Sequence, residues 1–350
     1  MPPVPVLTAK AVATNVPVLI EPPPVGHVTP ILSVTVRSQV GGVLSKVNFQ
    51  EGQDVQAGDL LFNIDPRPMQ AALDQAKAAL QRDAAQLENA KIQFDREQKL
   101  FDQKLVSQDE FDTSRAAYDA LAGTAAADRA AITNAQINLG YTEIRAPISG
   151  RTGALPFHEG NVIKAPDDVL VTINQIHPIY AGFAVPERYL PEIQRQMRDH
   201  TLAVTASFEN MPGDAARGEL TFVDNAVDST TGTIQLRATF PNTRSELWPG
   251  QFVKISLQLD ELAAAVVVPT QAVQASQNGQ FTFVVKPDKT VELRTLKSSV
   301  IYRGLTVITS GVNAGETVVT DGQLRLMPGA KVNEKAQDAF ESATNAAAKP

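Results

Sequence analysis

Two stretches of the chain, residues 41–65 and 148–173, repeat one pattern, and this split repeat constrains the fold more than any other feature. Each copy alternates apolar and polar residues between glycine-containing turns, which predicts short β-strands. A fragment of two or three strands cannot bury its own apolar face, so we expect the copies to pack against each other in one domain. The aligned pairs are Gly42 with Gly150, Phe49 with Phe157, Glu51-Gly52 with Glu159-Gly160, Ala57 with Ala165, Asp59 with Asp167 and, after one inserted residue, Leu61 with Leu170 and Ile64 with Ile173.

Each copy resembles one half of the carrier domains that hold biotin or lipoate on a lysine. Those domains place the lysine on a tight hairpin between the halves, whereas residues 66–140 separate the copies here. Lys46 and Lys164 lie inside the copies instead. A lysine-modified carrier protein is therefore an alternative function, for which incubation with a ligase and mass analysis is expected to show no adduct.

Residues 66–140 have the composition and spacing of two long helices. Asp65 is the expected N-cap, and Pro66 is the expected first helical residue. Two rows of apolar residues recur every seven positions and mirror each other about Val106. They are Leu73, Leu80, Leu87, Phe94 and Phe101 in the first arm, and Phe111, Tyr118, Ala125, Ile132 and Leu139 in the second.

Folding back near Val106 brings these rows together as an antiparallel coiled-coil hairpin. Each arm of about 35 residues reaches roughly 50 Å at a rise of ~1.5 Å per residue. The apolar seam is expected to be one row wide and the other faces polar, so the hairpin is predicted to project into solvent. At the turn, Ser107 with Glu110 predicts a capping box, and Val106 with Phe111 predicts a hydrophobic staple.

Beyond residue 173 the apolar pattern and the turn residues predict β-structure, interrupted by one short helix from about Glu187. Residues 224–242 are expected to form two strands joined by a turn at Thr230, Thr231 and Gly232. Closely spaced strands of this kind suggest a small barrel. The predicted fold class is mostly β with a long antiparallel α-helical hairpin, in an elongated multi-domain chain.

The last part of the chain carries two further predictions. Asn278-Gly279 between apolar runs predicts a β-hairpin. Residues 336–350 are rich in alanine and are expected to be a disordered tail.

Composition excludes several classes of protein. The 350-residue chain has a formal net charge of −7 and no basic stripe, which argues against nucleic-acid binding. Cysteine is absent, so disulfides, thiol catalysis and cysteine metal sites are excluded. No apolar run is long enough for a membrane span, and the first residues do not resemble a signal peptide. If the natural protein is exported, this chain is expected to be a mature or trimmed form.

Candidate catalytic and metal-binding residues are scattered. His27, His158, His177 and His200 fall in four different segments, and no spacing typical of a metal site links them. Asp167-Asp168 and Asp224 with Asp228 are acidic pairs, but turn acids are much commoner than catalytic pairs, and no nucleophile accompanies them. We therefore expect neither catalysis nor a cofactor.

Several motifs together resemble the periplasmic adaptors, or membrane fusion proteins, of resistance-nodulation-division (RND) efflux pumps, and in particular the MdtA-like multidrug branch. These motifs are the split repeat, the hairpin, TTGTIQLRATF, PGQFV and VVVPTQAV, and they follow the family's order from about Pro5 to Val332. The resemblance implies four domains and a tail. They are a lipoyl-like domain from residues 33–65 and 141–173, an α-hairpin from 66–140, a β-barrel from 174–262, a membrane-proximal domain from 1–32 and 263–335, and the tail from 336–350.

The resemblance also implies partners and contact residues. Such adaptors assemble as a ring, usually of six protomers, between an inner-membrane RND transporter and an outer-membrane TolC-like channel, and they work in the periplasm. Arg96, Leu100 and Ser107 match the family's channel-contact motif at the hairpin tip, which is Arg, three residues, Leu, six residues and Ser. The turn at Thr230, Thr231 and Gly232 is expected to dock on the transporter.

Plainer interpretations and other functions stay open. Arg96 is also explained as a solvated helical arginine, Leu100 as an apolar residue flanking the seam, and Ser107 as a helix cap. An adaptor for an ABC-type exporter and a stand-alone periplasmic binding protein are alternative functions. Stoichiometric small-molecule binding by the isolated chain in calorimetry would favour the binding protein.

Overall fold

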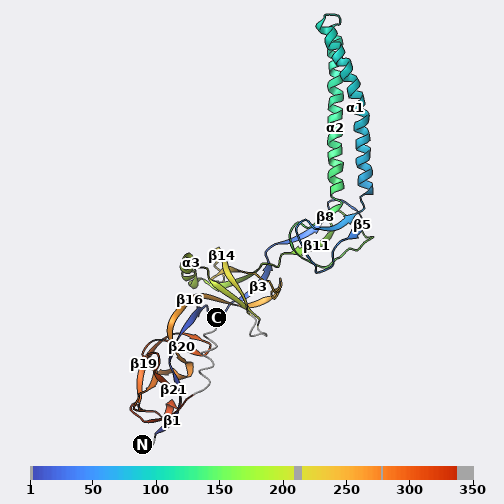
Figure 1. Ribbon diagram of the computed structural model, residues 1–350. Helices are drawn as coiled ribbons and strands as arrows, with labels where there is room; N and C mark the ends of the chain where they lie inside the picture. The colour runs from blue at the N-terminus through green and yellow to red at the C-terminus, as the bar shows by residue number, and fades with distance from the viewer. Residues whose placement is uncertain (1–2, 209–214, 277–278, 337–350) are drawn as a thin grey trace. The chain divides into compact units, whose positions relative to one another are not determined.

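The computed structural model describes residues 3–208, 215–276 and 279–336. The chain divides into two compact units (Figure 1). We call residues 30–179 with 242–249 the hairpin unit, and residues 1–29, 180–241 and 250–350 the barrel unit. The prediction of a mostly β chain with a long helical hairpin is confirmed. Of the predicted tail, Ala336 ends a strand, and the rest lies outside the described residues.

Two four-stranded sheets in the hairpin unit are each built from both copies of the repeat. The sheet orders are β10-β5-β7-β8 and β4-β11-β9-β6, so each sheet takes strands from both copies. The first copy contains β5 (Gly42–Val47), β6 (Asp54–Val55) and β7 (Leu60–Ile64), and the second contains β9 (Gly150–Thr152), β10 (Val162–Ile163) and nearly all of β11 (Val169–Asn174). The remaining strands, β4 (Ser33–Arg37) and β8 (Glu143–Arg145), lie just before the first and second copies.

The apolar faces of the two copies share one core. Leu61 and its repeat partner Leu170 are completely buried in the same cluster. Phe49 is buried there as well, and its partner Phe157 packs against it from the edge of the cluster. The prediction that the copies complete one another is confirmed, because neither copy alone has the strands to cover these side chains.

The repeated glutamates explain part of the pairing. Glu51 Oε1 accepts the backbone N–H of Leu155 at 2.6 Å, and Glu159 Oε1 accepts that of Val47 at 3.0 Å. Leu155 and Val47 occupy equivalent positions in the two copies. In each copy, the N–H of this equivalent residue donates to the repeated glutamate of the other copy, so the two contacts are reciprocal.

One pair in the alignment is wrong. Asp59 Oδ2 accepts the N–H of Gln56 at 2.7 Å, and the residue that does the same in the second copy is Asp168, whose Oδ2 accepts the N–H of Lys164 at 2.7 Å. The inserted residue therefore lies within the turn, ahead of the capping aspartate, and Asp168 rather than Asp167 is equivalent to Asp59. Sequence identity alone does not show which of two neighbouring acids caps the turn.

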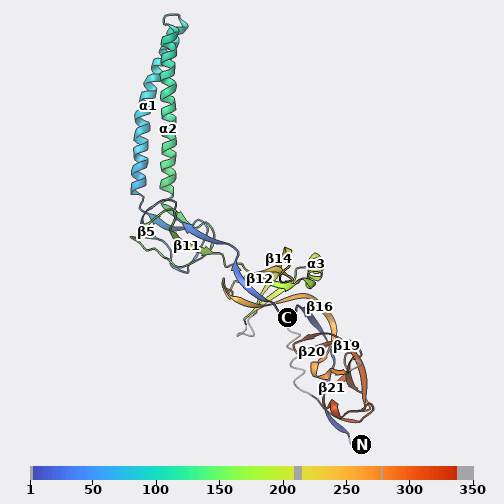
Figure 2. The ribbon, with the colours of Figure 1, turned by 180° about the vertical axis from the view of Figure 1, so that it is seen from behind.

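The hairpin consists of α1 (Arg67–Asp102) and α2 (Gln108–Gly140), which lie side by side in both views (Figures 1 and 2). The predicted pairs Phe101 with Phe111 and Phe94 with Tyr118 are stacked, with ring centroids 4.9 and 5.5 Å apart. These contacts confirm the register of the fold-back.

The helix is assigned from Arg67, one residue after the predicted start, with Pro66 at the position before it. Pro66 has a φ of −79° and a ψ of −13°, which are helical angles, so its backbone agrees with the predicted start. Asp65 still supports the helix start, because its Oδ1 accepts the N–H of Arg67 at 3.1 Å. The Arg67 guanidinium bonds the same carboxylate and, with that N–H, lowers the pKa of Asp65 to about 2.

The seam is wider than predicted, because a second row, in which all residues but Leu121 are small or polar, is also buried or half-buried. The central pair of this row consists of Asp83, with 5% of its surface exposed, and Asp128. The Arg82 guanidinium donates two hydrogen bonds to the Asp83 carboxylate, from Nε to Oδ1 at 2.6 Å and from Nη2 to Oδ2 at 3.0 Å. These bonds lower the pKa of the Asp83 carboxyl group. The whole row is Ala76, Asp83, Ala90 and Glu97 on α1, and Ser114, Leu121, Asp128 and Ala135 on α2.

The barrel unit holds the remaining helices and strands, except that Pro30 at the end of β3 and Ile179 at the start of β12 belong to the hairpin unit. These elements are β1 (Val4–Lys10), β2 (Val12–Leu19), β3 (Val25–Pro30), β12 (Ile179–Pro186), the 3-10 helix η1 (Glu187–Tyr189), α3 (Leu190–Asp199), β13 (Ala203–Ser207), β14 (Ala216–Asp228), β15 (Thr233–Phe240), β16 (Phe252–Pro269), η2 (Thr270–Ala272), β17 (Gln274–Ser276), β18 (Gly279–Val285), β19 (Val291–Tyr302), β20 (Leu305–Ser310), β21 (Thr317–Asp321), η3 (Gln323–Arg325) and β22 (Val332–Ala336). The short helix expected from about Glu187 is confirmed as η1 and α3. β17 pairs with β18, which confirms the second hairpin, although Asn278 lies outside the described residues.

The longest strand, β16, crosses the predicted border between residues 262 and 263. One end pairs with β3 and β13, and the other pairs with β2 and β20. Ala264 has a φ of 51° and the pairing with β2 shifts register beside it, so the strand bends close to that border. The four-domain division stays a prediction.

No helix among the described residues is long and apolar enough to cross a membrane.

The register of the hairpin predicts that it can be shortened. Deleting residues 80–86 together with 126–132 removes one heptad from each arm and preserves the phase of both seam rows. The deletion also removes Asp83 and Asp128 together. We expect a folded protein whose hairpin is about 10 Å shorter.

Far-UV circular dichroism and small-angle X-ray scattering measure this outcome. Deleting residues 80–86 alone is the control, because it leaves the arms unequal and should lower the melting temperature. Loss of cooperative unfolding in the matched deletion would contradict the proposed register.

Candidate functional site at the hairpin tip

The five residues 103–107 join the two helices, and the backbone holds this turn closely. The N–H of Leu105 bonds to the carbonyl of Leu100, and the N–H of Lys104 bonds to that of Phe101, both at 2.8 Å. This pair of bonds is the Schellman motif that ends many helices. The position that usually holds glycine is occupied by Lys104, with a φ of 57°. The last carbonyls of α1 are therefore satisfied within the turn.

The second helix begins at the predicted capping box. Ser107 Oγ accepts the N–H of Glu110 at 3.3 Å, and Glu110 Oε2 accepts the N–H of Ser107 at 3.0 Å. The N–H and the hydroxyl of Ser107 both donate to the Glu110 carboxylate and hold the pKa of Glu110 below its usual range. Because the folded-state pKa is lowered, the cap stabilises the hairpin above the ordinary carboxyl pKa and is lost as pH falls through the lowered value.

The three residues of the channel-contact motif differ in exposure. Arg96 and Ser107 are exposed, and Leu100 is half-buried one helical turn after Arg96 on the same face of α1. Within the described part of the chain, Arg96 forms no ion pair. Its guanidinium is thus uncommitted, whereas Ser107 has the capping role and the Leu100 carbonyl has a role in the Schellman motif. No contact in the structure tests the motif itself.

The sequence analysis missed Leu105. This side chain is 67% exposed in the connecting turn, close in the chain to the half-buried Leu100. In a Schellman motif these two positions commonly pair an apolar side chain with another. An apolar residue five positions after Leu100 is the sequence signal for that pair, but the absent glycine concealed the motif.

The turn at Thr230, Thr231 and Gly232 forms as predicted. The N–H of Gly232 bonds to the carbonyl of Asp228 at 2.8 Å, and Gly232 has a φ of 63°. The Thr230 hydroxyl and N–H both donate to Asp228 Oδ1 and lower the pKa of that carboxyl group. Thr230 and Thr231 are exposed. Transporter docking by this turn stays a prediction.

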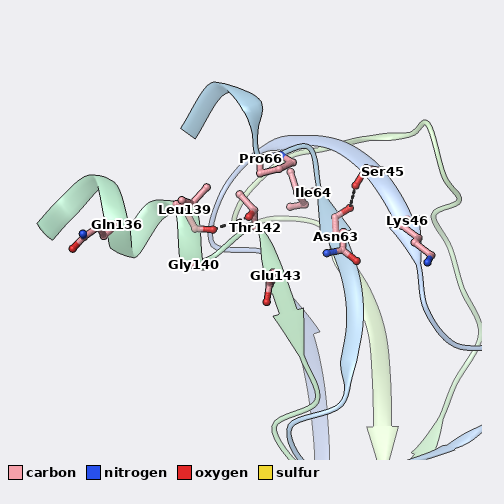
Figure 3. A pocket seen from close by; sticks show the side chains of 10 residues that line it. All are labelled: Ser45, Lys46, Asn63, Ile64, Pro66, Gln136, Leu139, Gly140, Thr142 and Glu143. Carbon is pink, nitrogen blue, oxygen red and sulfur yellow. Dashed lines mark hydrogen bonds between the residues drawn. The ribbon is translucent and has the colours of Figure 1, made fainter. Parts of the chain in front are cut away.

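An open groove of about 840 Å³ lies where α1 and α2 meet the two four-stranded sheets (Figure 3). It is lined by residues such as Lys46, Asn63 and Glu143. Lys46 lies within strand β5 and not on a hairpin turn. The place between the copies where a carrier domain has its modified lysine is occupied by α1 and α2, which removes the structural basis of the carrier alternative.

Three of the four acidic residues considered for catalysis accept hydrogen bonds from nearby backbone N–H groups. Asp168 accepts from Lys164, Asp228 accepts from Thr230, and Asp224 accepts the N–H of Asn225 at 2.7 Å. In residues 3–208, 215–276 and 279–336, no group of three or more His, Asp or Glu side chains is placed to hold a metal ion.

The Schellman turn predicts a stabilising substitution. Lys104→Gly removes the steric cost of a side chain in the left-handed region and is expected to stabilise the hairpin by about 1 kcal/mol. Gln103→Gly is the control, because Gln103 has a φ of −86° and glycine there adds only chain entropy to the unfolded state. The helical circular-dichroism signal during thermal unfolding measures both. An unchanged or lower melting temperature for Lys104→Gly would contradict the assigned turn.

Comparison with known families matches three consecutive parts of the chain. Residues 32–174 match the barrel-sandwich hybrid domain of RND membrane fusion proteins, residues 178–261 match their β-barrel domain, and residues 264–325 match their C-terminal permuted SH3 domain. The first match contains the hairpin together with both copies of the repeat.

Individual relatives agree with this assignment. The multidrug resistance protein MdtA of Erwinia amylovora is 40% identical over 93% of this chain and 80% of its own length. MdtA of Pantoea ananatis is 42% identical over 94% of this chain and 80% of its own length. The crystal structure of MacA from Actinobacillus actinomycetemcomitans shares the fold, with a TM-score of 0.55 at 24% identity over 90% of this chain and 98% of that one. From its matched domains and its identity to MdtA along most of its length, the chain belongs to the RND-type membrane fusion proteins, the family of periplasmic efflux adaptors.

Proposed function

We propose that this protein is the periplasmic adaptor of a tripartite efflux system that exports drugs or other small toxic compounds. It bridges an inner-membrane RND transporter and an outer-membrane TolC-like channel. The identity of about 40% to multidrug resistance proteins over most of the chain supports the transport role. The three matched domain families are all of the RND type, which favours an RND transporter over an ABC-type partner.

The observation that carries the proposal is the design of the hairpin. Two long helices end in a turn whose backbone groups bond to one another, and α1 presents the uncommitted cation of Arg96 within two turns of that end. Arginine is one of the residue types that are enriched at interface hot spots, and the half-buried Leu100 adds apolar surface on the same face of α1. We assign the channel contact to Arg96, Leu100 and Ser107.

The rest of the assembly follows from the same proposal. The adaptor surrounds the export path as a ring, with six protomers as the proposed number. The exposed threonines of the turn at Thr230, Thr231 and Gly232 dock on the transporter. The protein performs no catalysis of its own and faces the inner membrane from the periplasm.

The tip proposal predicts a loss of transport without a loss of stability. Arg96→Asp reverses an exposed charge, which usually changes the free energy of unfolding by no more than roughly 0.5 kcal/mol. At the channel it is expected to cost about 1–3 kcal/mol per protomer, repeated around the ring. Cells that carry Arg96→Asp with the transporter and channel should lose drug tolerance, while the purified protein melts at an unchanged temperature.

A matched control separates position from charge. Arg129→Asp makes the same change at an exposed residue of α2 away from the turn, and it should retain tolerance. Full tolerance of Arg96→Asp at normal expression would remove Arg96 from the channel contact.

Ser107 needs a different comparison, because it also caps α2. Ser107→Ala is expected to cost about 1 kcal/mol of hairpin stability with no partner present, whereas Ser107→Asp keeps a capping oxygen. If both variants lose tolerance but only Ser107→Ala melts earlier, the hydroxyl has a role beyond the cap. Full tolerance of Ser107→Asp would leave Ser107 with the capping role alone.

A further inference from the structure

The connection between β21 and β22, residues 322–331, turns one side chain inward and two outward. Leu326 is 8% exposed and joins the apolar cluster that contains Val6, Phe283 and Val332. On either side of it, Leu324 is 102% exposed and Met327 is 73% exposed. These two side chains are the most exposed large apolar residues that the described chain offers, and they lie three positions apart.

The turn is held in place, so its exposed side chains are presented by a fixed backbone. The N–H of Leu326 bonds to the carbonyl of Gln323, and that of Ala330 bonds to the carbonyl of Met327, each at 3.0 Å. The Gln323 side chain donates to the carbonyl of Gln271 in η2 at 3.1 Å. Gly322 has a φ of 91°, and a Cβ there would lie 3.1 Å from the carbonyl oxygen of Pro5. The turn therefore lies beside the first residues of β1.

Three cationic residues, which we call the cationic collar, lie in this connection or on the β18–β19 turn that is hydrogen-bonded to its end. Arg325 lies between the two exposed apolar residues in the sequence, and Lys331 pairs in an isolated bridge with Thr290 of the β18–β19 turn, which also carries Lys289. All three cations are exposed, and none forms an ion pair with another described residue. This cationic collar contrasts with the net charge of −7 of the whole chain.

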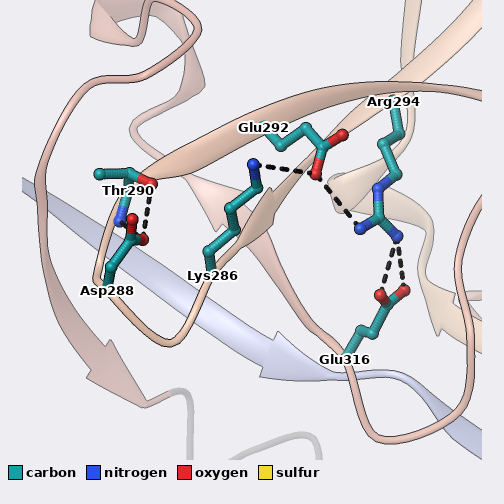
Figure 4. Close-up of polar contacts among 6 residues, drawn as sticks. All are labelled: Lys286, Asp288, Thr290, Glu292, Arg294 and Glu316. Carbon is teal, nitrogen blue, oxygen red and sulfur yellow. Dashed lines mark hydrogen bonds and ion pairs between the residues drawn. The ribbon is translucent and has the colours of Figure 1, made fainter.

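Several neighbouring charges outside the collar are engaged with one another or with their own turn. The Lys286 Nζ lies 3.5 Å from Glu292 Oε2, and Arg294 bonds to both Glu292 and Glu316 (Figure 4). Asp288 accepts the hydroxyl and the N–H of Thr290 and so faces its own turn.

We propose that residues 322–331 form an interfacial anchor, which inserts Leu324 and Met327 into the headgroup region of an anionic lipid surface. Arg325, Lys289 and Lys331 then meet the lipid phosphates. A convex turn with an apolar apex and a basic collar suits a soft, anionic interface, where apolar burial and charge attraction add. A protein partner would need a concave pocket matched to two projecting side chains.

This anchor goes beyond the adaptor role and does not depend on it, because the proposed contact needs only this chain and lipid. Flotation with vesicles of phosphatidylglycerol and phosphatidylethanolamine, compared with pure phosphatidylcholine vesicles, measures it on the full chain. We expect the chain to float with the anionic vesicles and to bind less as salt is raised.

Variants assign the binding to the turn. Leu324→Ser with Met327→Ser is expected to lower the partition coefficient by about tenfold or more, because two inserted side chains no longer leave water. Arg325→Glu with Lys331→Glu should abolish the preference for anionic vesicles. Ile301→Ser is the matched control, since Ile301 is an exposed apolar residue of β19 in the same unit, and it should bind like the unaltered chain. The melting temperature of each variant establishes that it is folded.

Three results would overturn the proposal. They are no flotation of the unaltered chain with anionic vesicles, equal flotation of the Leu324→Ser/Met327→Ser variant, and flotation only when the vesicles contain a reconstituted transporter. The last result would assign the turn to a protein surface and not to lipid.

Discussion

The structure of the hairpin unit depends on one constraint, which is that neither copy of the split repeat can bury its apolar face without the other. The shared core and the reciprocal bonds of Glu51 and Glu159 enforce that pairing. The pairing also fixes the ends of the inserted segment, because the N–H of Ile64 bonds to the carbonyl of Thr142 at 2.8 Å across the base of the hairpin. The insertion must therefore leave and return at one place, and two helices of nearly equal length satisfy this requirement.

The hairpin that extends from this base serves to place side chains at its tip and is not expected to catalyse a reaction. Its aromatic pairs fix the register, and the Schellman turn and the capping box satisfy the backbone groups at the far end. The side chains near the turn are consequently free to meet a partner without being needed to close the fold. Arg96 illustrates this division, because it forms no ion pair with any described residue, whereas Ser107 caps α2 and would have a second task only if the proposed channel contact holds. This is the arrangement expected of an assembly adaptor whose contacts are made by side chains on a rigid support.

The sequence predicts those features that depend on local pattern. Repeat spacing, heptad spacing and the Ser107–Glu110 box are periodic or short-range, and the structure confirms each. Features that depend on distant neighbours escaped prediction. Asp83 is a charged residue of the kind that usually faces solvent, yet α2 packs over it and buries it. Lys104 escaped for a local reason, because it occupies the left-handed position of the Schellman turn that usually holds glycine. The exposure of Leu324 depends on which of three nearby apolar side chains fills the core, and Leu326 does so.

The central claim, that the hairpin tip and the turn at Thr230, Thr231 and Gly232 contact different membrane complexes, is tested most directly by site-specific cross-linking in living cells. A photoactivatable residue at Gln103 in the hairpin turn and another at Thr231 in the barrel unit would be compared in the same strain. The account predicts that the probe at Gln103 captures an outer-membrane channel and that the probe at Thr231 captures an inner-membrane transporter. Capture of one common partner by both probes, or of no membrane protein by the probe at Gln103, would contradict it.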